Sequence, residues 1–236
     1  MAKQFTSVWT REARKPKASG LSREQIVRAA IELLDADGLE ALSMRKLAAK
    51  LGSGTTSVYW YVANKDELLE LALDDVWGLI RTPEQDADWR ELIDVFAHSM
   101  RDVLRAHPWA ASLLGKLPSL GPQAFALTDR LRRAMVQAGF DGIEVYLASG
   151  TVTCFVFGQV VPEIAWRASS EGKIDIDLLH EAAQTLAADY PELRADYEKT
   201  LAMDHEKARN DSFDFGLNCV LDGLAARLAR GSRESG

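Results

Sequence analysis

The stretch Ser43–Leu69, SMRKLAAKLGSGTTSVYWYVANKDELL, decides the fold of the N-terminal part of this chain. Apolar residues repeat at helical spacing in its first third, at Met44, Leu47, Ala48 and Leu51. They predict a short helix from Ser43 that ends at Gly52, because glycine readily follows the end of a helix. A second short helix is predicted from about Thr55 to Tyr61. Two short helices joined by a glycine-containing turn are typical of the helix-turn-helix motif, whose second helix enters the DNA major groove.

The polar residues of this stretch suit contact with duplex DNA. Threonine and serine at the start of the second helix can reach base edges, while tyrosine hydroxyls and basic side chains can reach phosphates. The candidate DNA-binding residues are Arg45, Lys46, Thr55, Thr56, Ser57, Tyr59, Trp60, Tyr61 and Lys65. Each has a plainer interpretation: the aromatics can belong to the core, the Thr/Ser run can be a helix cap, and the lysines can be solvated. Their joint spacing favours DNA binding.

The flanking sequence predicts further helices. Residues 23–36 form an amphipathic pattern that follows a Ser22–Gln25 capping box and ends at Gly38. Asn64 and Glu67 form another capping pattern, which starts a helix over residues 65–80. Helical patterns continue at residues 88–107, 108–117, 123–139, 142–161, 174–190, 191–199 and 213–229. Without a convincing strand pattern or repeat, the fold class is all-α: a three-helix helix-turn-helix domain followed by a larger helical domain.

The charge distribution agrees with this division. The chain has 236 residues, 47% hydrophobic and 27% charged, with a net charge of −7. Residues 1–66 hold 11 Lys/Arg against 7 Asp/Glu, so the remainder is strongly acidic. A cationic N-terminal part on an acidic body is typical of a polyanion-binding module joined to a separate domain, although a chance fluctuation explains a modest excess equally well.

Four segments are therefore expected: a basic flexible arm (residues 1–20), the DNA-binding domain (21–66), a ligand-binding and dimerisation domain (67–230) and a disordered tail (231–236). The arm contains Lys3, Arg11, Arg14, Lys15 and Lys17. It can follow a minor groove as basic arms do, or be a solvated extension without specific contacts.

The location is expected to be cytoplasmic. No secretory signal and no run of 18 apolar residues is present, so no transmembrane helix is expected. Cys154 and Cys219 lie in apolar helical patterns, which predicts buried free thiols in a reducing compartment.

The stretch from Arg45 to Leu69 resembles the DNA-binding region of TetR-family transcriptional regulators, in the run R-K-L-A-x-K-L-G…V-Y-W-Y-V-x-N-K-x-x-L-L. The similarity includes residues 21–44 and continues more weakly through the body, which resembles the tetracycline-repressor type. The resemblance implies that Arg45 and the Thr55–Ser57 run contact bases. It also implies that Tyr59, Tyr61 and Lys65 bind phosphates, although close relatives often have histidine at the position of Tyr61.

The resemblance further implies a homodimer held by a four-helix bundle, here from residues 141–168 and 212–230. The apolar pattern points the same way, because one helix cannot turn all of its large apolar residues inward, at Leu147, Cys154, Phe155, Val156 and Phe157. Two DNA-binding domains on a two-fold axis read successive major grooves about 34–36 Å apart, so the expected operator is an inverted repeat.

The body is expected to bind a small effector that shifts the population of DNA-binding conformations. Helix 65–80 would transmit the change, because it directly follows the second helix of the motif. Candidate ligand-binding residues are Trp77, Phe96, Met100, Trp109, Leu113, Leu117, Phe125, Met135, Phe155, Gln159, Glu163 and Trp166. For each of them, plain core packing is the alternative.

No cofactor or metal is expected. Tetracycline repressors use a histidine as a magnesium ligand where this chain has Ser112-Leu113-Leu114, and Pro162 stands where a family glutamate is expected. The resemblance therefore favours a bulky apolar or aromatic effector over a magnesium–tetracycline complex. An enzyme is not expected, since no nucleophile, phosphate-loop or metal-ligand motif occurs. The remaining alternatives are a DNA-binding regulator controlled by a protein partner or without an effector, and activation in place of repression.

Overall fold

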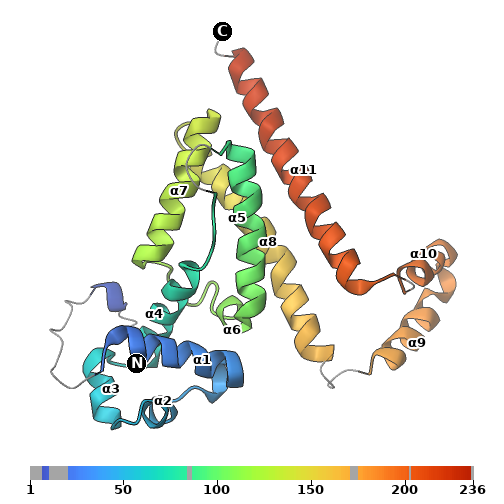
Figure 1. Ribbon diagram of the computed structural model, residues 1–236. Helices are drawn as coiled ribbons and strands as arrows, with labels where there is room; N and C mark the ends of the chain where they lie inside the picture. Colours follow the sequence, from blue (N-terminus) through green and yellow to red (C-terminus); the bar gives the residue numbers. More distant parts are fainter. Residues whose placement is uncertain (1–6, 11–20, 84–86, 171–174, 202, 235–236) are drawn as a thin grey trace, which may run out of the picture. The chain divides into compact units, whose positions relative to one another are not determined.

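The computed structural model describes residues 7–10, 21–83, 87–170, 175–201 and 203–234 of the chain, and within these ranges it contains helices but no strands (Figure 1). This confirms the predicted all-α class. The elements are η1 (Val8–Thr10), α1 (Arg23–Ala41), α2 (Met44–Lys50), α3 (Thr55–Tyr61), α4 (Lys65–Trp77), α5 (Trp89–Ala106), α6 (Pro108–Ala111), α7 (Pro122–Ala138), α8 (Glu144–Ser170), α9 (Ile176–Leu186), η2 (Ala187–Asp189), α10 (Pro191–Leu201) and α11 (His205–Glu234).

Local capping explains where the first helices begin. Ser22 and Gln25 form the predicted capping box at the start of α1. The Ser43 side chain accepts a hydrogen bond from the backbone of Lys46, and the Asn64 side chain accepts one from the backbone of Glu67. These caps satisfy backbone donors that a helix cannot satisfy internally. Gly38 has φ +77° and kinks α1, which continues to Ala41 and does not end there.

The chain divides into two compact units, Met1–Ser149 and Gly150–Gly236, with the division inside α8. The first unit holds α1–α7 and the second holds most of α8 together with α9–α11. These units do not coincide with the expected segments 21–66 and 67–230, because α1 packs closely on both α4 and α6. The expected segment bounds remain predictions.

The first unit has one continuous apolar core. Its fully buried side chains include Ile26, Leu34, Leu47, Leu68, Leu73, Ile93, Phe96, Leu104 and Met135. Burying such side chains is the main favourable contribution to folding. The core joins the helix-turn-helix helices to α4–α7, so α3 is held on a packed support.

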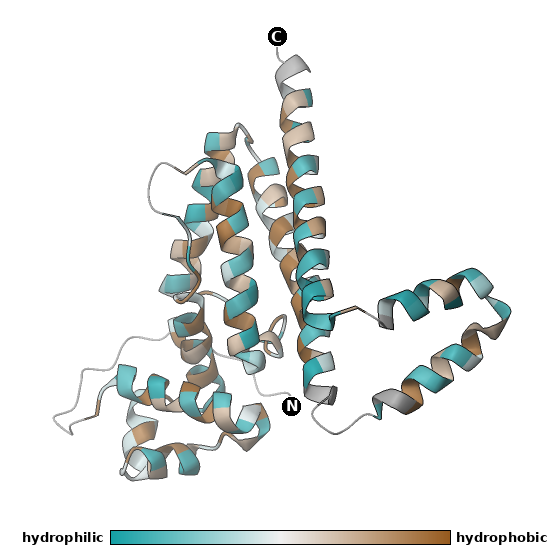
Figure 2. Cartoon of the chain, turned by 45° about the vertical axis from the view of Figure 1, so that its right-hand side comes forward, coloured by the Kyte–Doolittle hydropathy of each residue, from teal (hydrophilic) through white to brown (hydrophobic). Residues whose placement is uncertain are grey.

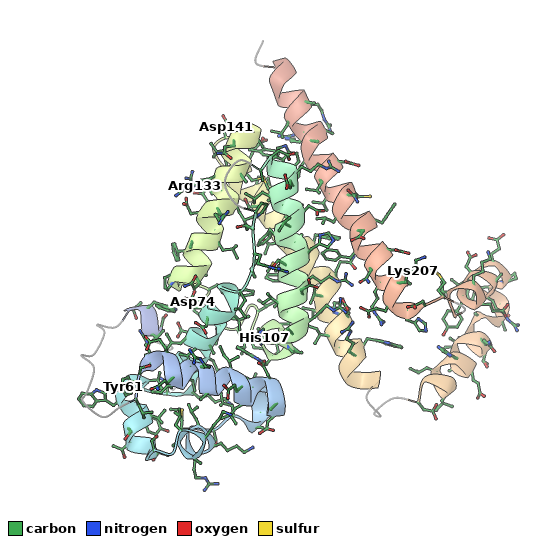
Figure 3. All side chains as sticks on the ribbon, in the orientation of Figure 1. Tyr61, Asp74, His107, Arg133, Asp141 and Lys207 are labelled. Carbon is green, nitrogen blue, oxygen red and sulfur yellow. The ribbon has the colours of Figure 1, made fainter. Side chains whose placement is uncertain are left out.

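A carboxylate on α4 caps α7 from a distance. The Asp74 side chain accepts hydrogen bonds from the backbone nitrogens of Gln123 (3.3 Å) and Ala124 (3.0 Å). The residue that precedes α7 is Gly121, which has no side chain of its own to do this. Figure 3 shows Asp74 on α4. The contact ties the two helices together at one point.

In the second unit, α8 and α11 contact each other through aromatic and charged side chains. The rings of Phe155 and Phe213 lie 5.4 Å apart, and Arg167 forms ion pairs with Glu163 and Glu206. Helices α9 and α10 carry hydrophilic and hydrophobic residues in alternation (Figure 2). By length and composition alone, Glu144–Arg167 could cross a membrane, as the core helix of a soluble protein also could.

Two boundary predictions and one burial prediction need correction. Helix α4 ends at Trp77, where Gly78 follows, and not at residue 80. Helix α11 begins at His205 and continues to Glu234, so residues 231–234 of the expected tail are helical. Cys154 on α8 and Cys219 on α11 are free, but both are exposed and not buried.

Candidate nucleic-acid interface

Helix α3 is anchored by one side chain and open on its other faces. Val58 is completely buried, whereas Thr55 and Thr56 are exposed and Ser57 is half-buried. Tyr59 and Trp60 are 45% and 40% exposed, so they are not core aromatics. The face of α3 that carries Thr55, Thr56 and Tyr59 is therefore free for contact with bases and phosphates.

Basic residues of α2 lie beside this helix in two different states. Arg45 is exposed and has no hydrogen bond or ion pair among the residues the structure describes. Lys46 pairs with Asp37 (3.5 Å) and Lys50 pairs with Glu32 (2.7 Å), both across to α1. Lys50 was missed by sequence reasoning, although it ends the first helix of the motif. Exposed pairs of this kind are weak, so phosphates can compete for the lysines.

Tyr61 and Lys65, which are predicted to bind phosphates, bind backbone carbonyls of α1 in the structure. The Tyr61 hydroxyl donates a hydrogen bond to the carbonyl of Leu21 (2.6 Å), and the Lys65 ammonium donates one to the carbonyl of Leu39 (2.8 Å). Figure 3 shows Tyr61 beside the start of α1. Both polar groups therefore tie α3 and α4 to the two ends of α1. The Tyr61 hydroxyl would have to release its carbonyl to donate to a phosphate, whereas the Lys65 ammonium has two further N–H donors.

Part of the expected flexible arm is folded. Val8 is buried, and the Ser7 hydroxyl and the Val8 backbone nitrogen both donate hydrogen bonds to the Glu70 carboxylate on α4. The Arg23 guanidinium lies 5.9 Å from the centre of the Trp9 ring, a cation–π distance. Val8–Thr10 of the expected arm thus form the short helix η1, and the flexibility of the arm stays a prediction. The basic arm residues Lys3, Arg11, Arg14, Lys15 and Lys17 lie outside the described residues.

The buried Glu70 predicts a pH dependence of stability. Burial raises the pKa of Glu70 above its usual value, and the hydrogen bonds from Ser7 and Val8 oppose this only in part. The folded state therefore binds a proton more tightly than the unfolded state, so this group reduces stability as pH rises through its raised pKa. Glu70→Gln removes the charge; its amide oxygen can still accept from the Val8 backbone nitrogen, and its amide nitrogen can donate to the Ser7 hydroxyl. We expect the stability of the variant relative to wild type to be higher at pH 7 than at pH 4, measured by urea denaturation.

Glu24 provides the opposite control. The Ser22 hydroxyl lowers the pKa of the exposed Glu24, so the ionised form stabilises the folded state and the benefit is lost as pH falls. Glu24→Gln should therefore be less stable than wild type at pH 7, with the difference shrinking at pH 4. The same sign for both variants would contradict this assignment.

The candidate ligand-binding residues do not line one described cavity. In the first unit, Trp77, Phe96, Met100, Trp109, Leu113 and Met135 are buried, Leu117 is half-buried and Phe125 is 60% exposed. In the second unit, Phe155 and Gln159 are half-buried, Trp166 is exposed, and Glu163 is buried beside Arg167. The indole nitrogens of Trp77 and Trp109 donate to Ser119 and Asp35. Most of this set thus serves packing within its own unit.

A cavity of about 500 Å³ opens elsewhere in the first unit. It lies between α5 and the residues that follow α4, and none of the twelve predicted ligand residues lines it. Its lining residues are Arg81, Thr82, Pro83, Asp94, Val95, His98, Ser99 and Asp102. Among the described residues, no group of three or more His, Cys, Asp or Glu side chains could hold a metal ion.

The supported helix α3, with its exposed polar face, defines a helix-turn-helix DNA-binding protein. Residues 26–72 match the family described as bacterial regulatory proteins, tetR family, and residues 82–228 match the tetracyclin repressor-like C-terminal domain. The chain belongs to the TetR family of transcriptional regulators, which is a family of DNA-binding proteins and not of enzymes.

Individual relatives agree with this assignment. The chain is 40% identical over 193 residues to an HTH-type transcriptional regulator of Saccharopolyspora erythraea, covering 81% of each protein. It is similar to the structure of Streptomyces coelicolor ActR in complex with actinorhodin, with a TM-score of 0.75 and 28% identity, covering 89% of this chain and 99% of that one. It also resembles BioQ bound to a double-stranded DNA operator, with a TM-score of 0.60 and 28% identity, covering 87% and 99%.

Proposed function

We propose that this protein is a homodimeric repressor that a bulky apolar or aromatic effector releases from an inverted-repeat operator. The observation that carries the proposal is the exposed polar face of α3, next to an Arg45 that has no partner in the described chain. A cation without an internal partner can donate two hydrogen bonds to a guanine in the major groove without first breaking an ion pair. The ActR–actinorhodin and BioQ–DNA complexes support the same pair of ligands, a small molecule and an operator.

The contacts to DNA divide by chemistry. Arg45, Thr55, Thr56 and Ser57 contact base edges and determine the sequence preference. Lys46 and Tyr59 contact phosphates, with Trp60 beside them on the exposed side of α3. Because their polar ends bind backbone carbonyls, Tyr61 and Lys65 maintain the orientation of α3 against α1.

Dimerisation is supported by the apolar residues that α8 and α11 leave uncovered. Val161 on α8 is 43% exposed and Phe215 on α11 is 73% exposed, and the exposed Cys154 and Cys219 lie on the same two helices. Exposed apolar surface of this kind is typical of a protein–protein interface. The dimer acts in the cytoplasm, and the effector shifts it between conformations that fit the operator well or poorly.

One observation favours the alternative of control without a small effector. Phe96 and Met135, two of the apolar residues expected to surround a ligand, are fully buried, and neither lines the cavity beside α5. If these residues only pack the core, regulation is left to a protein partner or to the concentration of the regulator itself. Binding of an effector to the purified protein, seen as a rise in its melting temperature, would decide between the two.

The experiment that tests the proposal is capture of genomic DNA fragments by the purified full-length protein, followed by sequencing and gel-shift titration. An enriched inverted repeat bound by a dimer is the expected result. A protein that stays monomeric and enriches no double-stranded fragment would overturn the proposal.

Arg45→Ala is expected to reduce discrimination at one base pair of each half-site by about 5- to 150-fold, the equivalent of one lost bidentate contact. Arg133→Ala is the matched control, because Arg133 lies on α7, away from α3, and pairs with Asp129. Gel shifts against operators substituted at each position measure the effect. An equal loss on every sequence for Arg45→Ala would assign Arg45 to a phosphate.

A further inference from the structure

We infer that Asp35 is a positioning residue that fixes the angle of the helix-turn-helix unit relative to the turn between α5 and α6. One carboxylate oxygen, Oδ1, accepts hydrogen bonds from His107 Nδ1 (2.8 Å) and from Trp109 Nε1 (2.7 Å). Asp35 belongs to α1, whereas His107 lies between α5 and α6 (Figure 3) and Trp109 lies in α6. The inference rests on the proposed function and concerns how its DNA-binding surfaces are held.

The two donors are themselves firmly placed. Trp109 is only 4% exposed, so its indole N–H needs a partner inside the protein. His107 ends α5 and directly precedes α6, and its ring meets that of Trp109 edge-to-face at 6.3 Å. Any movement of the turn between α5 and α6 therefore moves both donors together and acts on Asp35.

Unlike its acidic neighbours on α1, Asp35 contacts residues outside the helix-turn-helix unit. Glu32 and Asp37 pair with lysines of α2, so their interactions stay within the helix-turn-helix unit. The Asp35 carboxylate crosses from this unit to a different part of the fold. Its side chain is one-third exposed and that of His107 only 16% exposed, so the hydrogen bonds are partly shielded from competing water.

The Asp35 contact adds a directional constraint to the other attachments of α1. Helix α1 packs on α4 and α6, and Lys65 of α4 binds the Leu39 carbonyl near the end of α1. Apolar packing is non-directional, whereas hydrogen bonds depend on the angle between donor and acceptor. The two hydrogen bonds at Asp35, four residues before Leu39, therefore help to set the direction in which α3 faces the DNA.

The consequence is discrimination between operator spacings. One inserted base pair turns the second half-site by about 35° and moves it by about 3.4 Å. A dimer with firmly oriented DNA-binding units tolerates this poorly, whereas one with loosely held units adapts. Loss of the Asp35 contact should therefore weaken the preference for the correct spacing more than the binding itself.

The test compares the captured operator with versions that carry one or two extra base pairs between the half-sites. Wild-type protein is expected to bind the original at least about tenfold more tightly, as it would over a mismatched site. Asp35→Ala removes the Oδ1 acceptor of both hydrogen bonds and should reduce this ratio to below about threefold. Asp37→Ala removes a carboxylate from the same helix and should keep the wild-type ratio.

Several outcomes would overturn the inference. If Asp35→Ala keeps the wild-type ratio, or weakens binding to every spacing by the same factor, Asp35 has only a structural role. Should Asp35→Ala fail to fold, Trp109→Phe removes one donor and keeps an aromatic ring, and an unchanged ratio in that variant also rejects the inference. If the wild-type protein binds no operator at all, the proposed function fails, which is a separate result.

Discussion

Replacing Gly121 with alanine is expected to lower the free energy of unfolding by about 2–4 kcal/mol, the combined cost of overpacking and of a lost helix cap. A Cβ atom at this position would lie 2.1 Å from the carboxyl carbon of Asp74. The backbone of Gly121, with φ −77°, would accept any residue, so space alone forbids the side chain. Asp74 would have to move, leaving the nitrogens of Gln123 and Ala124 without their acceptor.

Urea denaturation of the two proteins measures this difference. Gly231→Ala is the matched control, because Gly231 lies in α11 and a Cβ there meets nothing within 4 Å. This control should be as stable as wild type or slightly more stable, since alanine favours helix over glycine. A loss below about 0.5 kcal/mol for Gly121→Ala, within the range of an ordinary surface change, would show that the capping contact has little weight.

The helices of the DNA-binding part could be predicted because their signals are local. Ser22, Ser43 and Asn64 each cap the helix that follows within three residues, and the predicted bounds of α3, Thr55–Tyr61, agree with the structure. Short-range patterns of this kind do not depend on how the remainder of the chain folds.

The partners of long polar side chains could not be predicted, because residues far apart in the sequence determine them. Lys65 and Tyr61 reach carbonyls of α1, and the indole of Trp109 reaches Asp35, 74 residues earlier. Periodicity marks a residue as amphipathic but does not say which group its polar end meets. Apolar side chains have the same uncertainty: the apolar character of Phe125 suggested that it lines a ligand pocket, but the structure leaves it 60% exposed.

The start of α11 could not be predicted from apolar periodicity, although its signal is local. The start of this helix at His205 extends the expected helix by eight residues through a polar segment without an apolar face. The Asp204 side chain caps this start by accepting hydrogen bonds from the backbone of Glu206 and Lys207, and a polar cap leaves no trace in an apolar pattern.

Raising the salt concentration from 50 to 200 mM is expected to weaken operator binding by about 10³-fold or more, if the two DNA-binding units together neutralise six or more phosphates. The physical reason is the release of condensed counterions from DNA when Lys and Arg replace them. The chain as a whole carries a net charge of −7, so the basic surface of α2 must act locally and against the charge of the body. Lys46 and Lys50, which pair with acids of α1 in the free protein, would exchange these partners for phosphates.

The salt dependence of variants also shows which lysines contact DNA phosphates. Lys46→Ala should reduce the slope of log affinity against log salt by about one for each phosphate contact removed. Lys199→Ala removes an equal charge from α10, where the lysine is exposed and pairs with Asp196, and should leave the slope unchanged. Equal slopes for all three proteins would place Lys46 outside the interface. A flat salt response of the wild-type protein would mean that α2 and α3 do not bind DNA through its phosphates, because no arrangement of neutral contacts releases counterions.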